Sequence, residues 1–364
     1  MVSLADFEPL ARLAMDPAAF DYVAGGAWDE ITLAENEAAW RRHRLRPRVL
    51  VDVSRVDAST TMLGQPTTMP MAVAPMAAQG MAHADAEIAT AGAAAATGVP
   101  FILSTMSTCS LEDVARAVPD GVRWFQLYAQ ADPGRTQELV QRAAAAGYRA
   151  IVLTVDLPVL GYRERDRRSG FDLVGPHGNF AALDALASHG GGIHADESAA
   201  LKQILTGLSW DDLDTIRSWS SLPLVLKGIV TAEDARLAVE QGADAIVISN
   251  HGARQLDRVQ APIDVLEGIV TAVDGRTEVW VDGGVRRGLD LAIARALGAR
   301  GVLVGKPIFW ALAAGGQAGV ERALAILREE FEIALALLGT PTPDAIGPGH
   351  VAGGTTGDSL LSER

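Results

Sequence analysis

The segment SNHGARQLD, residues 249–257, places a histidine and an arginine three positions apart, at His251 and Arg254. It follows an apolar run that is typical of a buried strand, so both side chains are expected at a strand end, where they can point at one ligand. A neutral imidazole can accept a proton near neutral pH, and a guanidinium can hold a carboxylate through two parallel hydrogen bonds. A lone histidine is more often structural, but the neighbouring arginine favours a general base beside an anion-binding group.

A second arginine, Arg163, begins a charged run that extends to Arg168. By itself, Arg163 is typical of a solvated surface charge. If it converges with Arg254 on one site, the pair suits a small carboxylate, an anion that a protein with a formal net charge of −14 otherwise repels.

Two glycine-rich segments, VWVDGGVRRG (279–288) and GVLVGKP (301–307), indicate a phosphate site. Glycines let backbone N–H groups approach an anion, the helix expected after the first segment adds a favourable dipole, and Arg286 and Lys306 add charge. The alternative is a pair of glycine turns with surface cations. Neither segment has the spacing of a P-loop or of a G-x-G-x-x-G fingerprint, so neither ATP nor a dinucleotide is indicated.

The elements that must position these residues alternate between strands and helices. Eight apolar segments are predicted to be buried strands: 71–75, 101–106, 124–129, 150–156, 224–228, 245–250, 278–282 and 301–305. All but one of the gaps between them suit a single helix, which predicts one (β/α)8 TIM barrel over residues 1–340; an open doubly wound sheet is the alternative. Polar residues at the strand ends would then face one mouth: Ser104, Gln126, Tyr128, Thr154, Asp156, Lys227 and Ser249.

Three segments lie outside this alternation. A helical segment is expected from Leu4 to Val23, before the first strand, and helical pattern follows the last strand to about Leu338. The long connection after the fourth strand predicts a lid over about residues 165–208. Residues 341–364 are rich in Gly, Pro and Thr and are expected to form a flexible tail.

Composition restricts the partners. A sequence pI of about 4.9 argues against nucleic acid and against an anionic membrane surface, because both are bound through basic patches. Cys109 is the single cysteine, which excludes an internal disulfide, offers no thiolate metal cluster and favours the cytoplasm. The sequence has no run of about 18 apolar residues and no basic-then-apolar start, so neither a membrane span nor a signal peptide is predicted.

Seven blocks of sequence, in order, resemble the FMN-dependent 2-hydroxy acid dehydrogenase family, which includes glycolate oxidase, lactate oxidase, mandelate dehydrogenase and the flavin domain of flavocytochrome b2. The blocks are FDYVAGGAWDEITLAEN (20–36), APMAAQGMAH (74–83), FQLY (125–128), LTVDLPVLGYRERD (153–166), LKGIVTAEDA (226–235), SNHGARQLD (249–257) and DGGVRRG (282–288). The resemblance runs from about residue 4 to residue 338. It implies oxidation of an (S)-2-hydroxy acid to a 2-oxo acid with FMN as the cofactor, in a homotetramer.

The resemblance also implies roles for single residues. His251 would be the base, with Asp156 hydrogen-bonded to it. The substrate would be bound by Tyr22, Met106, Tyr128, Arg163, His251 and Arg254. The flavin would contact Pro75, Met76, Ala77, Ser104, Gln126, Thr154, Ser249 and Lys227, the last of these offsetting the charge of reduced flavin. The phosphate of FMN would be held by Asp282, Gly283, Gly284, Arg286, Gly305 and Lys306.

Three positions refine this expectation. Lys306 stands where the family usually has arginine, so the phosphate would meet a point charge in place of a fork of donors. Met106 stands where glycolate oxidase has tryptophan, which predicts a substrate larger than glycolate, such as lactate, a medium-chain acid or mandelate. Ala77 stands where mandelate dehydrogenase has glycine, which favours O2 as the electron acceptor and hydrogen peroxide as the product. The alternatives are a dehydrogenase that uses a quinone or protein acceptor, a lactate monooxygenase, and a barrel that binds FMN without turnover.

Overall fold

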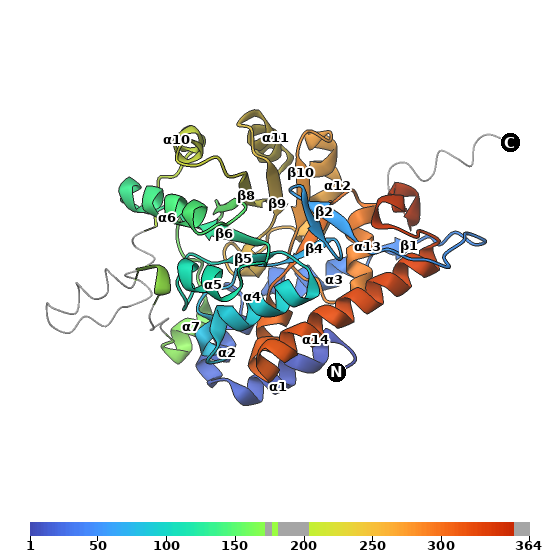
Figure 1. Ribbon diagram of the computed structural model, residues 1–364, viewed down its shortest axis with the longest axis horizontal. Coiled ribbons are helices and arrows are strands. Elements are labelled where there is room, and N and C mark those ends of the chain that lie inside the picture. Colours follow the sequence, from blue (N-terminus) through green and yellow to red (C-terminus); the bar gives the residue numbers. More distant parts are fainter. Residues whose placement is uncertain (172–176, 181–203, 353–364) are drawn as a thin grey trace, which may run out of the picture.

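Eight parallel strands close into a barrel in the computed structural model, which describes residues 1–171, 177–180 and 204–352 (Figure 1). The strands are β4 (Met71–Val73), β5 (Phe101–Leu103), β6 (Arg123–Leu127), β7 (Ile151–Thr154), β8 (Leu224–Ile229), β9 (Ala245–Ile248), β10 (Glu278–Val281) and β11 (Gly301–Val304). The barrel is closed because β11 pairs with β4, with Val302 opposite Met71 and Val304 opposite Val73. The predicted TIM barrel is therefore confirmed, and the open sheet is excluded.

Helices follow the strands around the outside of the barrel (Figure 1). They are α4 (Ala86–Thr97), α5 (Leu111–Ala117), α6 (Pro133–Ala145), α7 (Glu164–Ser169), α10 (Leu213–Ser218), α11 (Ala232–Glu240), α12 (Pro262–Val273), α13 (Gly288–Ala296) and α14 (Lys306–Leu338). The helix α14 contains a kink at Gly315 and Gly316, whose backbone angles are not helical. The predicted lid includes α7, but residues 172–176 and 181–203 lie outside the described residues.

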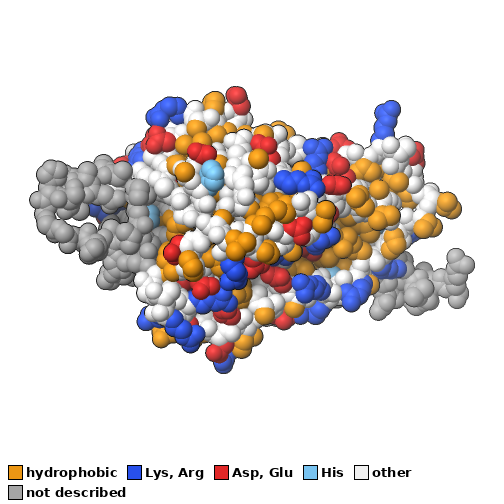
Figure 2. Space-filling view, turned by 90° about the horizontal axis from the view of Figure 1, so that it is seen from below, with side chains coloured by type: hydrophobic (Ala, Val, Ile, Leu, Met, Phe, Trp, Pro, Cys, Tyr) orange, Lys and Arg blue, Asp and Glu red, His pale blue; other side chains and the backbone are white. Residues whose placement is uncertain are grey.

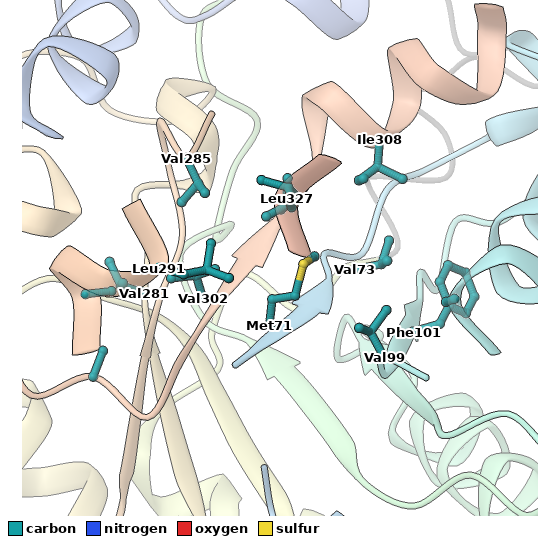
Figure 3. Packing of buried hydrophobic residues seen from close by; sticks show 14 of the residues in the cluster. Met71, Val73, Val99, Phe101, Val281, Val285, Leu291, Val302, Ile308 and Leu327 are labelled. Atoms are coloured by element: carbon teal, nitrogen blue, oxygen red, sulfur yellow. The ribbon is translucent and has the colours of Figure 1, made fainter. Parts of the chain in front are cut away.

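Alternation of side chains along the strands produces two hydrophobic cores. Outward-facing residues such as Met71, Val73 and Val302 pack against the helices, where they meet Leu291 and Leu327 (Figure 3). Inward-facing residues fill the barrel, and the rings of Trp124 and Trp280 stack there with their centroids 5.0 Å apart. The barrel interior is thus packed, so a ligand must bind at a rim.

The N-terminal segment is helical, as expected between about Leu4 and Val23, but it is divided into three pieces. It forms a short 3-10 turn (Leu4–Asp6), α1 (Phe7–Ala14) and α2 (Pro17–Ala24). The break occurs because Asp16 accepts hydrogen bonds from Ala18 N at 2.9 Å and Ala19 N at 3.2 Å, and so begins a new helix. A further helix that the sequence reading did not identify, α3 (Ile31–Trp40), precedes the barrel.

The flexible tail predicted from residue 341 was wrong for residues 341–352. They form two 3-10 turns (Pro343–Ala345 and Pro348–His350) and the strand β12 (Val351–Ala352), which pairs with β1 (Arg44–Leu45). Gly and Pro content does not predict the order of this segment, because the strand that pairs with it, β1, lies some 300 residues away in the chain. Residues 353–364 lie outside the described residues.

The remaining small sheet is a hairpin of β2 (Thr60–Met62) and β3 (Gln65–Thr67). It lies at the end of the barrel where the strands begin, since Leu63 N bonds to the carboxylate of Glu278 at the start of β10. Figure 2 shows basic and acidic side chains interspersed over one face of the molecule, with hydrophobic side chains between them. No helix in the described part of the chain is long and apolar enough to cross a membrane.

Candidate active site

A cavity opens at the rim of the barrel where the strands end, and about 1350 Å³ inside it is free of protein atoms, part of which is open solvent. The residues predicted for the site that line this cavity are Tyr22, Pro75, Met76, Ala77, Ser104, Met106, Gln126, Tyr128, Thr154, Arg163, Lys227, His251, Arg254, Asp282, Gly283, Gly284, Arg286, Gly305 and Lys306. Two predicted residues, Asp156 and Ser249, do not line it and instead contact residues that do. The barrel therefore brings together side chains that are spread over most of the sequence.

His251 lies between a carboxylate and a phenol. Its Nδ1 atom is 2.8 Å from Asp156 Oδ1, and its Nε2 atom is 3.4 Å from the hydroxyl of Tyr128. Burial lowers the pKa of His251 below its ordinary value, against the opposing effect of the Asp156 carboxylate. Burial disfavours ionisation of Asp156, but the adjacent His251 and Lys227 lower the pKa of this carboxyl. The pair thus contains an ionised Asp156 that fixes the proton on Nδ1, and a neutral imidazole whose Nε2 lone pair faces the cavity.

The backbone of the turn that holds His251 is unusual. His251, Gly252 and Ala253 have φ angles of 60°, 62° and 63°, in the left-handed region that side chains other than glycine disfavour. His251 N donates to Ser249 Oγ at 3.1 Å, so Ser249 helps to direct the imidazole. Strained backbone of this kind persists only where surrounding contacts hold it, and it is concentrated at functional sites.

Lys227, at the end of β8, is a buried cation beside His251. Its Nζ atom donates to Ser249 Oγ at 2.8 Å and lies 3.1 Å from Asp282 Oδ2. Burial alone would lower the pKa of Lys227, but the carboxylates of Asp282 and Asp156 raise it above its ordinary value, so the ammonium group stays charged. The next residue, Gly228, has a φ of 119°, and a Cβ atom there would lie 2.6 Å from Asp156. Glycine is therefore required for Asp156 to reach His251.

Two guanidinium groups lie close to the ring of Tyr22, which comes from α2. Arg254 Cζ is 4.5 Å and Arg163 Cζ is 5.7 Å from the ring centroid. Arg163 also donates from Nε to the Arg254 carbonyl at 3.2 Å, and Arg254 donates to the Tyr22 carbonyl. The two arginines expected to bind a carboxylate are thus brought together, and each is oriented by contacts with the protein.

A second group of cations lies at the ends of β10 and β11. Lys306 is partly buried and donates from Nζ to the carbonyls of Ala24 at 3.0 Å and Gly25 at 3.1 Å, at the end of α2. Burial lowers the pKa of Lys306 well below its ordinary value, and the nearby charges of Arg254 and Arg286 lower it further. A partly buried ammonium group among like charges is stabilised by an anion, as a phosphate would provide.

The glycines of this region are required for close packing. Gly283 and Gly284 have φ angles of 82° and 83°, and a Cβ atom on Gly284 would lie 1.9 Å from the carbonyl oxygen of Asn36 in α3. Trp40 of the same helix donates to the Gly283 carbonyl at 2.8 Å. These glycines therefore allow α3 to approach the turn, in addition to leaving its backbone accessible.

The N-terminus of α13, which was expected to add a favourable dipole to the phosphate site, has backbone N–H groups that bond to carboxylates. Asp290 accepts from the amides of Arg286 at 2.8 Å and Arg287 at 2.9 Å, and Glu330 accepts from Gly288 N at 2.7 Å. The Arg286 guanidinium also forms an ion pair with Glu37 at 2.7 Å.

A chain of hydrogen bonds connects polar residues at the ends of β5, β6 and β7. Gln126 donates from Nε2 to Thr154 Oγ1 at 3.0 Å, and its Oε1 accepts from Ser104 Oγ at 3.3 Å. Ser104 Oγ in turn accepts from Met106 N at 3.1 Å. This connects the wall formed by Met106 to the floor of the cavity.

The sequence reading assigned no role to α3, although two of its residues, Asn36 and Glu37, line the cavity. Asn36 stands at the end of the quoted block 20–36, so the signal was present without a chemical interpretation. Amide side chains in a helix are usually solvated, and only the three-dimensional structure brings this one to the rim.

The cavity fits the cofactor that the sequence predicted. Lys306 and Arg286 supply positive charge for a single phosphate at the ends of β10 and β11. Asp282 Oδ1 is buried without a hydrogen-bond partner in the described part of the chain, which indicates a donor from a bound molecule. Charged Lys227 provides a cation where a reduced flavin would carry negative charge.

Comparisons with known proteins agree with this geometry. Residues 11–353 match the family of FMN-dependent dehydrogenases. The L-lactate oxidase of Nostoc sp. (strain PCC 7120 / SAG 25.82 / UTEX 2576) is 50% identical over 344 residues, which cover 93% of this chain and 94% of that protein. Glycolate oxidase 3 of Arabidopsis thaliana is 47% identical over 360 residues, covering 96% of each. The crystal structure of mandelate oxidase with (S)-4-hydroxymandelic acid matches with a TM-score of 0.89 at 44% identity, covering 95% of this chain and 97% of that chain. The chain therefore belongs to the FMN-dependent dehydrogenase family, and it is an oxidoreductase whose cofactor is FMN.

Proposed function

We propose that the protein oxidises (S)-2-hydroxy acids with side chains larger than that of glycolate to 2-oxo acids, and that it passes the electrons to O2. The balanced reaction converts one hydroxy acid and one O2 into one oxo acid and one hydrogen peroxide. The relatives support the reaction class, since their names are L-lactate oxidase, glycolate oxidase and mandelate oxidase.

The observation that carries the proposal is the environment of His251. Its neutral imidazole is bonded through Nδ1 to Asp156 at 2.8 Å, while Nε2 faces the cavity beside the Tyr128 hydroxyl. Removing two electrons and two protons from a hydroxyl-bearing carbon requires a group that accepts a proton near neutral pH. The Asp156 carboxylate would stabilise the imidazolium that forms.

The substrate's carboxylate would be bound by Arg163 and Arg254, whose guanidinium groups flank Tyr22. Burial raises the pKa of Tyr128, so its hydroxyl stays protonated and would donate a hydrogen bond to the oxygen of the substrate. Held in this way, the C2 carbon would lie next to His251. When bound, FMN supplies the electron acceptor for the pair of electrons that leaves C2.

Two sets of residues would hold the cofactor. Lys306 and Arg286 would bind the phosphate, with Asp282, Gly283, Gly284 and Gly305 around it. The ring system would contact Pro75, Met76, Ala77, Ser104, Gln126, Thr154 and Lys227. Ser249 would act indirectly, through its hydrogen bonds to Lys227 and His251.

Met106 supports the preference for a larger substrate. It lines the cavity and is 4% exposed, so its side chain forms part of the wall. An unbranched thioether can change conformation to admit methyl, alkyl or phenyl groups.

The proposal also includes the assembly and location expected from the sequence, a homotetramer in the cytoplasm.

The test is a panel of glycolate, (S)-lactate, (S)-2-hydroxyoctanoate and (S)-mandelate offered to the holoenzyme, with O2 consumption and reduction of an artificial dye measured in parallel. We expect O2 consumption with stoichiometric hydrogen peroxide, and a kcat/KM for one of the larger acids at least about tenfold above that for glycolate. Dye reduction without O2 consumption would instead indicate a dehydrogenase, and a preference for glycolate would contradict the assignment of the pocket.

A further inference from the structure

The helix α3, which lies outside the barrel alternation, and the turn before it are bonded at three points to the His251 loop, residues 250–257. Ala27 N, just before the helix, donates to the Ala253 carbonyl at 2.9 Å. Asp257 Oδ1 accepts from Thr32 N at 2.8 Å and so caps the first turn of the helix from a distant part of the chain. The third point is a pair of asparagines, one in the middle of the helix and one at the start of the loop.

The side chains of Asn36 and Asn250 exchange both of their amide hydrogen bonds. Asn36 Nδ2 donates to Asn250 Oδ1 at 2.9 Å, and Asn250 Nδ2 donates to Asn36 Oδ1 at 2.7 Å. Both side chains are buried, and a buried amide that loses its partner is strongly destabilised. Asn250 Oδ1 also accepts from Ala253 N at 3.1 Å, so the pair is connected to the far end of the strained turn.

This turn depends on external support. The left-handed φ angles of His251 and Ala253 are unfavourable for residues with a Cβ atom, and the turn would relax if the contacts around it were lost. Relaxation would move the imidazole away from Asp156 and Tyr128. The asparagine pair is therefore well placed to keep His251 in its present geometry.

The same helix contacts the phosphate cradle, defined here as residues 282–286. The carbonyl of Asn36 packs against Gly284, Trp40 donates to the Gly283 carbonyl, and Glu37 pairs with Arg286. Asn36 thus contacts the His251 loop through its side chain and the cradle through its backbone. One residue therefore contacts both segments.

We propose that Asn36 is a positioning residue for His251, and that α3 couples FMN binding in the cradle to the ordering of the His251 loop. The inference rests on the proposed role of His251 as the base. It assigns a task to Asn250 and Asp257 of the SNHGARQLD segment, which hold the loop to α3 and do not line the cavity.

Hydrogen exchange of the backbone amides in the His251 loop tests this without relying on turnover. In the parent protein, adding FMN to the apoprotein should slow exchange in this loop. In Asn36→Ala, exchange should be about tenfold faster or more, the consequence of losing a buried hydrogen-bonded pair, and FMN should no longer slow it to the parent level. Asn179→Ala is the matched control, because Asn179 is also a buried amide but bonds to the backbone of Ser104 and Thr105.

Unchanged exchange in Asn36→Ala, or equal slowing by FMN in the parent and the variant, would overturn the inference. If Asn36→Ala does not fold, Asn250→Ala breaks the same pair from the loop side; if both fold, the double variant should exchange no faster than the more severe single one. Anaerobic flavin reduction should be about tenfold slower in Asn36→Ala, with partial recovery in Asn36→Asp, which keeps an acceptor for Asn250. His251→Gln, measured in parallel, separates the proposed function from this inference. Flavin reduction at the parent rate in His251→Gln would refute the role of His251 as the base. The hydrogen-exchange result tests the role of Asn36 independently.

Discussion

Replacing Asp156 by asparagine keeps the size of the side chain but removes the charge beside His251. In the parent, Asp156 Oδ1 and His251 Nδ1 are 2.8 Å apart, and the two side chains are 12% and 17% exposed. Two unit charges about 4 Å apart attract by about 4 kcal/mol at an effective dielectric constant of about 20. Each 1.4 kcal/mol corresponds to about a tenfold change in rate, so loss of the full attraction to the forming imidazolium would slow proton removal by about 10³-fold. Because the asparagine oxygen still accepts a hydrogen bond, we expect a decrease of roughly 10²–10³-fold.

The assay is anaerobic stopped-flow measurement of flavin reduction at saturating (S)-2-hydroxy acid, with the visible absorbance of FMN as the signal. Asp113→Asn, which removes an exposed carboxylate that pairs with Arg116 on α5, provides a control with the same chemical change and no expected effect. A reduction rate of Asp156→Asn within tenfold of the parent, with FMN bound and thermal stability unchanged, would refute the reasoning.

The pH dependence gives a second readout of the same pair. The neutral imidazole is the form that accepts a proton, and burial lowers the pKa of His251. The parent kcat/KM should therefore be constant at neutral and alkaline pH and should fall only as the pH drops below the ordinary histidine range. Asp156 raises the pKa of His251 against the effect of burial, so its removal should shift the acid limb to lower pH. A shift to higher pH would contradict the assigned charge state.

The other predictions concern binding and packing. Met106→Trp should fill part of the substrate pocket and move the ratio of kcat/KM values toward glycolate by about tenfold or more, as steady-state kinetics on the acid panel would show. Lys306→Met should weaken FMN binding by roughly 1.5–3 kcal/mol, measured by fluorescence titration of the apoprotein; an unchanged Kd would locate the phosphate elsewhere. Arg254→Met should raise KM more than it lowers kcat, and the parent should act poorly on 2-hydroxy amides. Gly284→Ala should lower the melting temperature and FMN affinity together, because its Cβ atom would lie 1.9 Å from the Asn36 carbonyl oxygen.

Much of the barrel could be predicted because its signals are local. Each barrel strand is buried on both faces, so it appears in the sequence as a short apolar run, and the eight runs coincide with β4 to β11. Parallel strands in a closed barrel end at one rim, so the polar residues that follow them must meet there, however far apart they are in the chain. This reasoning predicts that Lys227 and His251 face one mouth, and both line the cavity.

Local signals were insufficient where a segment depends on a distant partner. The break in the N-terminal helix is itself a local signal, because Asp16 followed by Pro17 is a common helix start. In contrast, no local pattern in residues 341–352 predicts a strand, because β12 forms only by pairing with β1. Nothing local in the sequence indicates that the N–H groups at the start of α13 bond to the carboxylates of Asp290 and Glu330, because Glu330 lies 42 positions from its partner Gly288.

The sequence by itself determined the chemistry of this protein: a histidine and an arginine after a strand, a lysine at another strand end, and two glycine turns with cations. The tertiary structure alone decided how that chemistry is held in place. The imidazole depends on Asp156 at the end of another strand, and its turn is bonded through Asn250 to Asn36, 214 positions away in the chain. Such hydrogen bonds leave no periodic or local pattern in the residues that form them, because their energy depends on burial and geometry that exist only once the barrel has closed.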